Sequence, residues 1–469
     1  KRQIQATGPV NVLTIFRWRL HPIMAEFFHD LPEGLLDWVA ALGPGTVSRL
    51  ERHVARREAW VVHVRRADGS ELKGFLRLDR HPDESSHVSL RREARICQAL
   101  MAHPVPAPDL LGWNEEHHAA LFSLDAGSAD LPGVEDKTRQ RAIMEDFIDV
   151  VARLHQLDTT ELGLEDILGP LPTSPAACAL GDLDLQLTQF HDFLAGYTDP
   201  LITYGVDWLR RFVPATVTRV SLVQGDTGPV NFMFQGDKVS ALVDWEWGHW
   251  GDPMEDLGNI CVREFWNPSG GLTGLFERYE RQSGIPYTRF AAQYYRIQQN
   301  VRGMIPIHAA CYYSARAESL AWYLCYRYVG DRSTCEALAD AMDIAIDRPP
   351  VPDERPVGPL ARAATKNLDR DVLPRLDDNF ARTRVRDVGI LVACMDRQAL
   401  HGAELEAIEC EEIGELLGQS HSDYQKALAA LDAAIRARSL EDAPLIQYLA
   451  RRAYRDEWLY APAASLYPD

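Results

Sequence analysis

The chain lacks the cysteine spacing that marks a metal-binding or zinc-ribbon fold. Its 469 residues include eight cysteines, but no CxxC pair and no His-rich spacing typical of a structural zinc site. This absence excludes the common zinc modules. The cysteines are best explained as buried thiols in a reducing cytosol, so we expect a cytoplasmic protein.

Long hydrophobic runs are absent as well. No apolar stretch approaches the roughly 18 residues that a membrane-spanning helix needs. The first 50 residues contain apolar patches, but charged side chains such as Arg17, Arg19 and Glu26 interrupt them. We therefore expect neither a signal peptide nor a membrane span.

Positive charge is in deficit. The chain has 49 Lys and Arg against 68 Asp and Glu, which gives a formal net charge of -19. Clustered basic residues are what bind a phosphate backbone, so nucleic acid is not an expected partner. Acidity suits a cationic substrate, but net charge mainly reports solubility and steering and cannot identify a ligand. Repeats of fixed period are also absent, and the length predicts two or three packed units.

The first part of the chain has the pattern of a small antiparallel sheet. Residues 60–78 form two β-rich runs around Asp68-Gly69, a strong hairpin signal. Residues 89–103 follow with apolar side chains at helical spacing. Three prolines then break the helix, and a short apolar strand leads to a turn at which a hinge between two lobes is expected.

Helical patterns dominate the rest. Five prolines near residue 350 predict an extended connector, followed by four or five helices with almost no strand pattern. The predicted organisation is an N-terminal extension (1–40), a β-rich lobe with hinge (41–125), a helical lobe (126–347), a Pro-rich linker (348–359) and a C-terminal helical domain (360–469).

The most informative segment is 221–258, SLVQGDTGPVNFMFQGDKVSALVDWEWGHWGDPMEDLG. Two β-rich runs flank a QGDK turn, so a hairpin is expected to present polar residues at its ends. Asp226, Asn231 and Asp244 are the candidates, five and thirteen residues apart. An isolated Asp or Asn would be explained as a turn residue, but the whole string is far more specific.

This string resembles the catalytic segment of the aminoglycoside phosphotransferase family, and the resemblance to the family extends over roughly residues 40–345 of the chain. The resemblance implies an α+β, protein-kinase-like bilobal fold, here with an additional C-terminal all-α domain. It also implies ATP and Mg as cofactors. Asp226 matches the catalytic base, and Asn231 and Asp244 match the metal ligands.

One position departs from the family pattern. Gln224 stands where His usually precedes the Gly-Asp pair, although Gln can make similar hydrogen bonds. We expect Asp252 and Asp256 to support the catalytic loop structurally. Glu246 is open between a second metal shell and a packed or solvated residue.

Upstream, Arg77 resembles the basic residue that reaches the ATP phosphates, and Glu93 its carboxylate partner on the helix. Lys73 lies on the same strand face and competes for this role. A surface salt bridge is the plain alternative for the pair. Phe75 would lie near the adenine, where relatives more often have a smaller residue.

The remaining features of the nucleotide site are weaker signals. LFSLD, ending at Asp125, is placed where the hinge would bind the base, or is an ordinary buried strand. LGPGTVS at 42–48 is the available candidate for a phosphate-covering loop.

His155 is assigned a structural role at a helix end. Trp245, Trp247 and Trp250 are favoured as core over an acceptor pocket.

The resemblance implies transfer of the ATP γ-phosphate to a hydroxyl of a small molecule. The wording of residues 244–257 is closest to a subgroup that phosphorylates hydroxyacyl-CoA thioesters, so a hydroxyacyl-CoA or similar hydroxy-metabolite is the leading acceptor. An aminoglycoside or macrolide kinase is the alternative, and a non-catalytic kinase-like scaffold is a third reading. A homodimer is the assembly that we consider.

Overall fold

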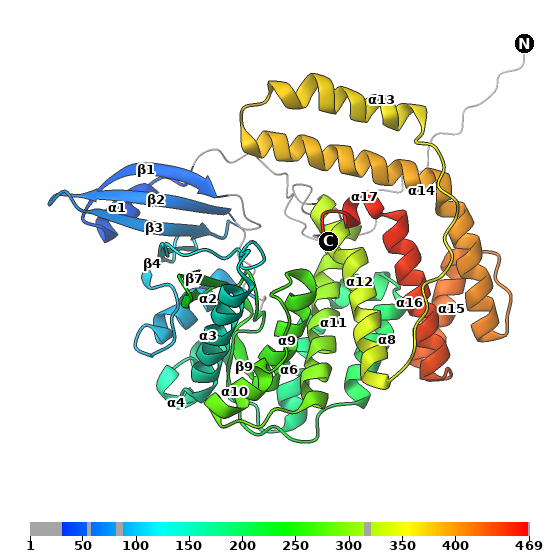
Figure 1. The fold of residues 1–469 in the computed structure, drawn as a ribbon, viewed down its shortest axis with the longest axis horizontal. Coiled ribbons are helices and arrows are strands. Elements are labelled where there is room, and N and C mark those ends of the chain that lie inside the picture. The colour runs from blue at the N-terminus through cyan, green and yellow to red at the C-terminus, as the bar shows by residue number, and fades with distance from the viewer. Residues whose placement is uncertain (1–30, 54–57, 81–87, 314–319, 468–469) are drawn as a thin grey trace, which may run out of the picture.

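The computed structural model describes residues 31–53, 58–80, 88–313 and 320–467. The chain forms a β-rich N-terminal lobe, drawn at the left of Figure 1, and a much larger helical lobe. The α+β bilobal fold predicted from the sequence is confirmed, including the helices that follow the kinase-like part. In the described part of the chain, no helix is long and apolar enough to span a membrane.

The N-terminal lobe is built on a five-stranded antiparallel sheet in the order β1-β2-β3-β5-β4. Its elements are α1 (Leu35–Leu42), β1 (Gly45–His53), β2 (Glu58–Arg66), β3 (Glu71–Leu78), α2 (Leu90–Leu100), β4 (Leu110–Asn114) and β5 (Ala119–Ser123). The predicted hairpin is present: Gly69 has a positive φ of 84° in the β2–β3 turn, and Asp68 accepts a hydrogen bond from the Ser70 amide at 2.9 Å.

Alternation along β3 decides which side chains reach the helical lobe. Leu76 and Leu78 are buried on the face that packs against α1. Phe75 and Arg77 point to the opposite face, and Phe75 packs against the core of the helical lobe. This face is therefore the one that carries the candidate nucleotide-binding residues.

The helical lobe contains the longest buried helices and two short antiparallel ladders. Its helices are α3 (Lys137–Gln156), α4 (Thr159–Leu162), α5 (Glu165–Leu168), α6 (Pro175–Gln189), α7 (His191–Gly196), α8 (Pro200–Arg211), α9 (Pro253–Trp266), α10 (Leu275–Ser283), α11 (Arg289–Tyr313) and α12 (Leu320–Met342). The ladders pair β6 (Ser221–Val223) with β9 (His249–Gly251), and β7 (Phe232–Gln235) with β8 (Lys238–Leu242); the 3-10 turn η1 (Trp245–Trp247) follows β8.

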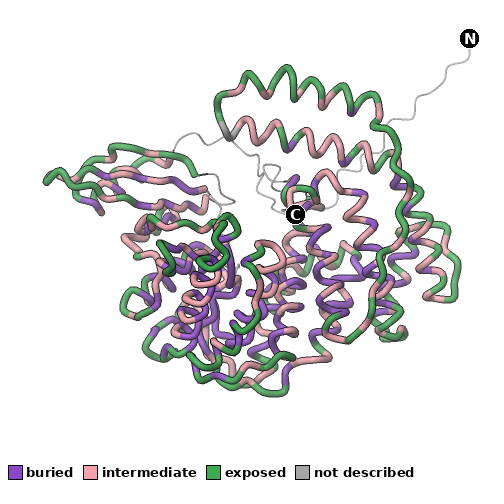
Figure 2. The backbone as a smooth tube through the Cα atoms, in the orientation of Figure 1, coloured by how far each residue is buried: buried purple, intermediate pink, exposed green. Residues whose placement is uncertain are grey.

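The C-terminal helices share the core of the helical lobe. Residues 344–358, without helix or strand, cross from α12 to α13. The later elements are α13 (Pro359–Asn367), the π turn η3 (Leu368–Val372), the 3-10 turn η4 (Leu373–Arg375), α14 (Asn379–Leu417), α15 (Tyr424–Arg436), α16 (Asp442–Leu459) and α17 (Ala461–Ala464). Leu431 and Leu449 belong to the same contiguous set of buried side chains as Leu209 and Leu338. Figure 2 shows this buried backbone running through α16 into the helical lobe.

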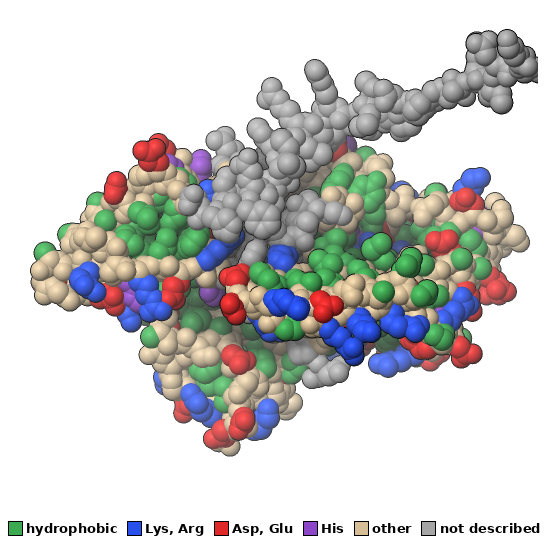
Figure 3. Space-filling model, turned by 90° about the horizontal axis from the view of Figure 1, so that it is seen from above, with side chains coloured by type: hydrophobic (Ala, Val, Ile, Leu, Met, Phe, Trp, Pro, Cys, Tyr) green, Lys and Arg blue, Asp and Glu red, His purple; other side chains and the backbone are tan. Residues whose placement is uncertain are grey.

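A helical hairpin, formed by α13 and the first half of α14, projects from the body of the molecule (Figure 1). Its backbone is mostly exposed or half-buried in Figure 2. Viewed from above in Figure 3, hydrophobic side chains lie along the hairpin and Lys and Arg line one edge. Leu360 is 86% exposed and Met395 71% exposed on these helices.

Candidate active site

The β7–β8 hairpin brings two of the predicted metal ligands together. The amide of Val243 donates to the carbonyl of Asn231 at 3.0 Å, so Asn231 and Asp244 lie at the same open end of the hairpin. Val230 and Asp244 have left-handed backbones, with φ of 71° and 63°. Such strained conformations in non-Gly residues persist where the surrounding structure holds a functional loop in place.

Gln224 joins the catalytic loop to the loop that carries Asp244. Its Nε2 donates to the carbonyls of Val243 at 2.9 Å and Asp244 at 3.1 Å. Its Oε1 accepts from the amide of Asp226 at 2.9 Å and from the hydroxyl of Thr227 at 3.0 Å. The side chain that departs from the family pattern therefore uses both ends of its amide to fix the two loops relative to each other.

The carboxylate of Asp226 is held by three side chains from different elements. Arg263 on α9 donates Nε to Oδ1 at 2.9 Å and also contacts Oδ2 through Nη2. Gln299 on α11 donates to Oδ1 at 3.1 Å. Nδ2 of Asn231 donates to Oδ2 of Asp226 at 2.9 Å and to the backbone carbonyl of Asp226 at 2.7 Å. The candidate base is thus fixed in one orientation, with 16% of its side chain exposed.

Arg77 and Glu93 form the predicted pair in the N-terminal lobe. Nη1 of Arg77 lies 2.6 and 2.7 Å from the two carboxylate oxygens of Glu93, and 3.4 Å from Oδ1 of Asp244. Burial acts to lower the pKa of Arg77, but the two carboxylates outweigh it and the pKa is raised. With 13% and 6% of their side chains exposed, Arg77 and Glu93 are a buried pair rather than a surface salt bridge.

Lys73, the competitor for this role, is exposed, whereas Arg77 on the same strand face reaches Glu93 and Asp244. Phe75 lies between them and makes an edge contact with His53, with ring centroids 5.4 Å apart. The basic position facing the catalytic loops is therefore held by Arg77.

Two further predictions for the nucleotide site concern Asp125 and residues 42–48. Asp125 accepts hydrogen bonds from the Gly127 amide at 2.6 Å and the Ser240 hydroxyl at 2.8 Å, so its carboxylate fastens the turn after β5 to β8. A role in nucleotide binding for Asp125 stays a prediction. The LGPGTVS segment at 42–48 is the junction between α1 and β1, with Gly43 at the helix C-terminus. Residues 54–57, between β1 and β2 in the sequence, lie outside the described residues.

Asp256 supports the catalytic loop through hydrogen bonds from the loop backbone, as expected from the sequence. Its two oxygens accept the backbone amides of Gln224 and Gly225, each at 3.0 Å, and His155 Nε2 lies 3.0 Å from Oδ2. Burial acts to raise the pKa of Asp256, but these hydrogen bonds outweigh it and the pKa is lowered. Asp252 caps α9 through the Met254 amide, and burial raises its pKa to about 6.

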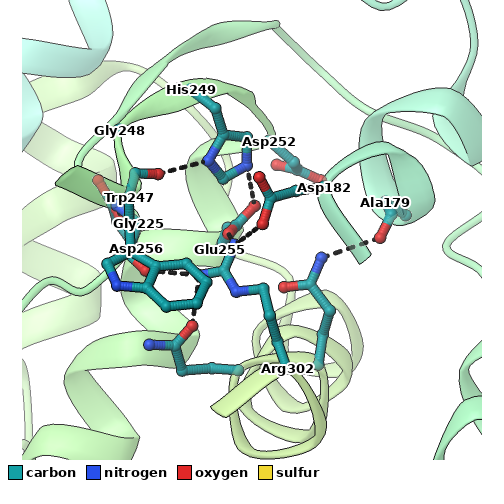
Figure 4. Close-up of polar contacts among 12 residues, drawn as sticks. Ala179, Asp182, Gly225, Trp247, Gly248, His249, Asp252, Glu255, Asp256 and Arg302 are labelled. Carbon is teal, nitrogen blue, oxygen red and sulfur yellow. Dashed lines mark hydrogen bonds and ion pairs between the residues drawn. The ribbon is translucent and has the colours of Figure 1, made fainter. Parts of the chain in front are cut away.

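A second buried network supports the site through α11 (Figure 4). Arg302 binds Asp182 at 2.6 Å, Glu255 at 3.2 Å and the carbonyl of Gly225 at 2.6 Å. Its guanidinium also lies 4.6 Å from the centre of the Trp247 ring. Arg302 thereby ties the catalytic loop to the helices behind it.

Glu255 in this network also faces His249, with 3.1 Å between Oε2 and Nε2. Burial acts to lower the pKa of His249, but the Glu255 carboxylate outweighs it and raises the pKa to about 9. His249 is therefore a buried cation at neutral pH.

The tryptophans favoured as core divide into two kinds. Trp245 and Trp250 are 0% and 4% exposed, and their indole N–H groups bind backbone carbonyls. Trp247 is half-buried and stacked on Arg302. Glu246, whose role the sequence left open, is buried at 1% exposure.

The oxygen atoms at the open end of the hairpin fit a magnesium ion bound through a nucleotide. Among the residues that the structure describes, no group of three or more His, Cys, Asp or Glu could hold a metal by itself. Mg takes oxygen ligands and often needs only one or two from the protein when phosphates supply others. Because Nδ2 of Asn231 binds Asp226, Oδ1 is the atom of this amide that can bind a cation, beside the carboxylate of Asp244.

Sequence reasoning missed Arg263 and Gln299. Arg263 lies in the last turn of α9, where a basic residue is readily explained by the helix dipole. Gln299 lies in the middle of a long helix, 73 residues from Asp226. No local pattern marks either residue, because only the packing of α9 and α11 against the loop brings them to Asp226.

Comparison with known proteins places this chain in a family. The profile of the phosphotransferase enzyme family, APH, matches residues 49–294, more than half of the chain. Acyl-CoA dehydrogenase family member 11 of Rattus norvegicus is 26% identical over 212 residues, which cover 42% of this chain and 26% of the relative. Acyl-CoA dehydrogenase family member 10 of Mus musculus is 27% identical over 244 residues, covering 49% and 22%.

The chain thus spans about a quarter of the length of these curated relatives. Among solved structures, the aminoglycoside phosphotransferase APH(3'')-Id from Streptomyces rimosus, in complex with ADP and streptomycin, has a TM-score of 0.41 at 18% identity. The match covers 57% of this chain and 98% of that one. By the extent of the family match, the chain belongs to the phosphotransferase enzyme family.

Proposed function

We propose that this chain is an ATP- and Mg-dependent kinase that transfers the γ-phosphate to a hydroxyl group of a small molecule. The observation that carries the proposal is the convergence of Asp226, Asn231 and Asp244 on one hairpin end that also faces Arg77. These are an acceptor-facing carboxylate, two oxygen ligands and a cation for phosphate, which are the groups that phosphoryl transfer requires.

Each side chain has a distinct role in this mechanism. Asp226 accepts the proton of the acceptor hydroxyl. As it does so, the hydroxyl oxygen bonds to the γ-phosphorus, and the bond between this phosphorus and the ADP oxygen breaks. Arg77, held by Glu93, binds the α- and β-phosphates, and Asn231 and Asp244 would hold Mg. The metal supplies neutralisation of phosphate charge. Arg263 and Gln299 hold Asp226 in its orientation before the transfer.

We favour a hydroxyacyl-CoA or similar hydroxy-metabolite as the acceptor. The matched relatives are named as acyl-CoA dehydrogenase family members, which is in keeping with an acyl-CoA acceptor. An aminoglycoside or macrolide kinase is the alternative, and the acidic net charge is its support.

The decisive assay is ATP consumption by the purified protein with Mg, against a panel of 4-hydroxyacyl-CoAs, aminoglycosides, choline and homoserine. We expect selective turnover of the acyl-CoA class, abolished in Asp226→Ala with nucleotide binding retained. Asp237→Ala, an exposed carboxylate in the β7–β8 turn paired with Arg139, is the matched control and should keep full activity.

Other outcomes of the panel discriminate between the proposals. Turnover of aminoglycosides alone would select the antibiotic kinase. A protein that binds no ATP would leave only the non-catalytic scaffold. Equal loss of nucleotide binding and turnover in Asp226→Ala would contradict the assignment of Asp226 as the base. The homodimer stays a prediction, to be measured as molar mass in solution by light scattering.

A further inference from the structure

The last turn of α9 connects the candidate base to a group of aromatic side chains. Arg263 binds Asp226, and Trp266 follows three residues later, one helical turn away. Tyr326 on α12 contacts Trp266 with ring centroids 5.4 Å apart, and it is close enough to Arg263 to influence the pKa of the guanidinium. An aromatic surface therefore begins beside the reacting carboxylate.

This surface continues along α12. Trp322, four residues before Tyr326, lies 5.9 Å from it between ring centroids. Trp322 and Tyr326 are 38% and 41% exposed, although burial of large aromatic side chains is favourable. We call Trp266, Trp322 and Tyr326 the aromatic wall.

The segment that follows α17 packs against the aromatic wall. Tyr467, just after α17, stacks on Phe265 at 5.3 Å and meets Trp266 edge-on at 5.2 Å. Its hydroxyl also donates to the carbonyl of Phe265. In Figure 1 the C-terminus, α17 and the upper end of α12 lie at the same end of the helical lobe.

Carboxylates close to the wall are already bound within the protein. Glu264 accepts the amides of Ser269 at 2.8 Å and Gly271 at 2.9 Å. Glu336 and Glu457 are both paired with Arg332, whose guanidinium lies 5.2 Å from the Phe265 ring. Among the residues that the structure describes, these three carboxylates beside the wall are therefore already paired.

We propose that the aromatic wall is the acceptor subsite that binds the hydrocarbon part of the hydroxylated substrate, and that Tyr467 completes it. The inference rests on the proposed kinase function and adds the chemical class of the acceptor: an aliphatic chain beyond the hydroxyl, packed on Trp266, Trp322 and Tyr326. The C-terminal segment then contributes to acceptor selection through Tyr467, which holds Trp266 in place.

The test compares Trp322→Ala, Tyr326→Ala and Tyr467→Ala with Phe290→Ala. Phe290 is 45% exposed and lies at the N-terminal end of α11. It is the matched control for removal of an exposed ring. With saturating ATP, we expect kcat/KM for a long-chain 4-hydroxyacyl-CoA to fall about 10- to 200-fold in the first three variants, mainly through KM. A short-chain acceptor should lose much less, and the KM for ATP should stay unchanged.

A binding measurement separates failure of the subsite from failure of the kinase proposal. A long-chain acyl-CoA without the hydroxyl cannot be phosphorylated, but it should bind the wall and change the tryptophan fluorescence of the wild-type and Phe290→Ala proteins. Weaker binding in Tyr326→Ala and Tyr467→Ala would support the subsite even if no acceptor turns over. No binding by the wild type, or equal binding by wild type and all variants, would overturn it.

Discussion

Arg263 binds the carboxylate of Asp226 at two points. Nε donates to Oδ1 at 2.9 Å, and Nη2 donates to Oδ2. Burial acts to lower the pKa of Arg263, but Asp226 outweighs it and the pKa is raised, so the guanidinium stays charged. A planar cation with two parallel donors fixes both the position and the plane of a carboxylate. In this site, orientation of the candidate base is the task of a residue far from the catalytic loop in sequence.

Replacement Arg263→Lys should therefore lower kcat while leaving ATP binding unchanged. Lysine keeps the charge but cannot make the two-point contact, and misplacement of a reacting group by about 1 Å can cost about 100-fold in rate. Arg278→Lys is the control, because Arg278 binds Asp149 through Nε and Nη2 at 2.7 Å each, away from the site. Equal kcat values for the two variants would argue against orientation by Arg263.

Gly228 makes room for this arginine. It has a φ of 145°, and a Cβ there would collide with Cβ and Cγ of Arg263. Gly228→Ala should thus reproduce the loss of kcat seen in Arg263→Lys, and the double variant should be little worse than either single one. Gly236→Ala is the control: its φ is also positive, at 59°, but no atom lies within 4 Å of the added Cβ. This control should lose stability only, in denaturant titrations.

Glu93→Gln should weaken ATP binding more than turnover. Nη1 of Arg77 would lose a charge-assisted contact at 2.6 Å, so the guanidinium would no longer be held in one position. We expect the KM for ATP to rise about tenfold or more, which corresponds to about 1.4 kcal/mol. Glu58→Gln removes a comparable pair with Arg80 in the same lobe, with 2.8 Å between Oε1 and Nη2. An increase in KM of the same size in both variants would show general weakening of the lobe.

Much of the site could be predicted from the sequence, because Asp226, Asn231 and Asp244 lie within one hairpin and its flanking loops. Local spacing fixes their geometry, as Asp68-Gly69 fixes the β2–β3 turn. Strand β1 was not predicted, because most of its nine residues are exposed and its sequence, GTVSRLERH, lacks an apolar alternation. Arg263 and Tyr467 depend on packing between distant segments, which no local pattern records.

His249 makes stability depend on pH. Its pKa is about 9 in the folded protein, above the usual value of about 6.5, so the folded state holds a proton that the unfolded state releases between these values. The contribution is complete below pH 6.5 and is lost as the pH rises to 9, about 3 kcal/mol in all. Urea titrations of wild type and His249→Gln at pH 6.5 and 9 measure it.

In this comparison the difference between the two proteins isolates His249, because the cysteines, whose thiol pKa values burial raises in the folded protein, are common to both. We expect the wild type to lose the larger share of its unfolding free energy on going to pH 9. A parallel decline in the two proteins would mean that His249 carries no excess proton in the folded state.

The continuous core of the helical lobe has a consequence for cutting the chain. Leu431 and Leu449 pack among the kinase-like helices, and Asp442 binds Arg211 at 2.8 Å across the same boundary. A protease that cleaves within residues 344–358, where the chain has no helix or strand, should produce two bands on a denaturing gel but one peak in size-exclusion chromatography. Expression of residues 1–347 alone should give an aggregating fragment, since its apolar side chains would lose their cover.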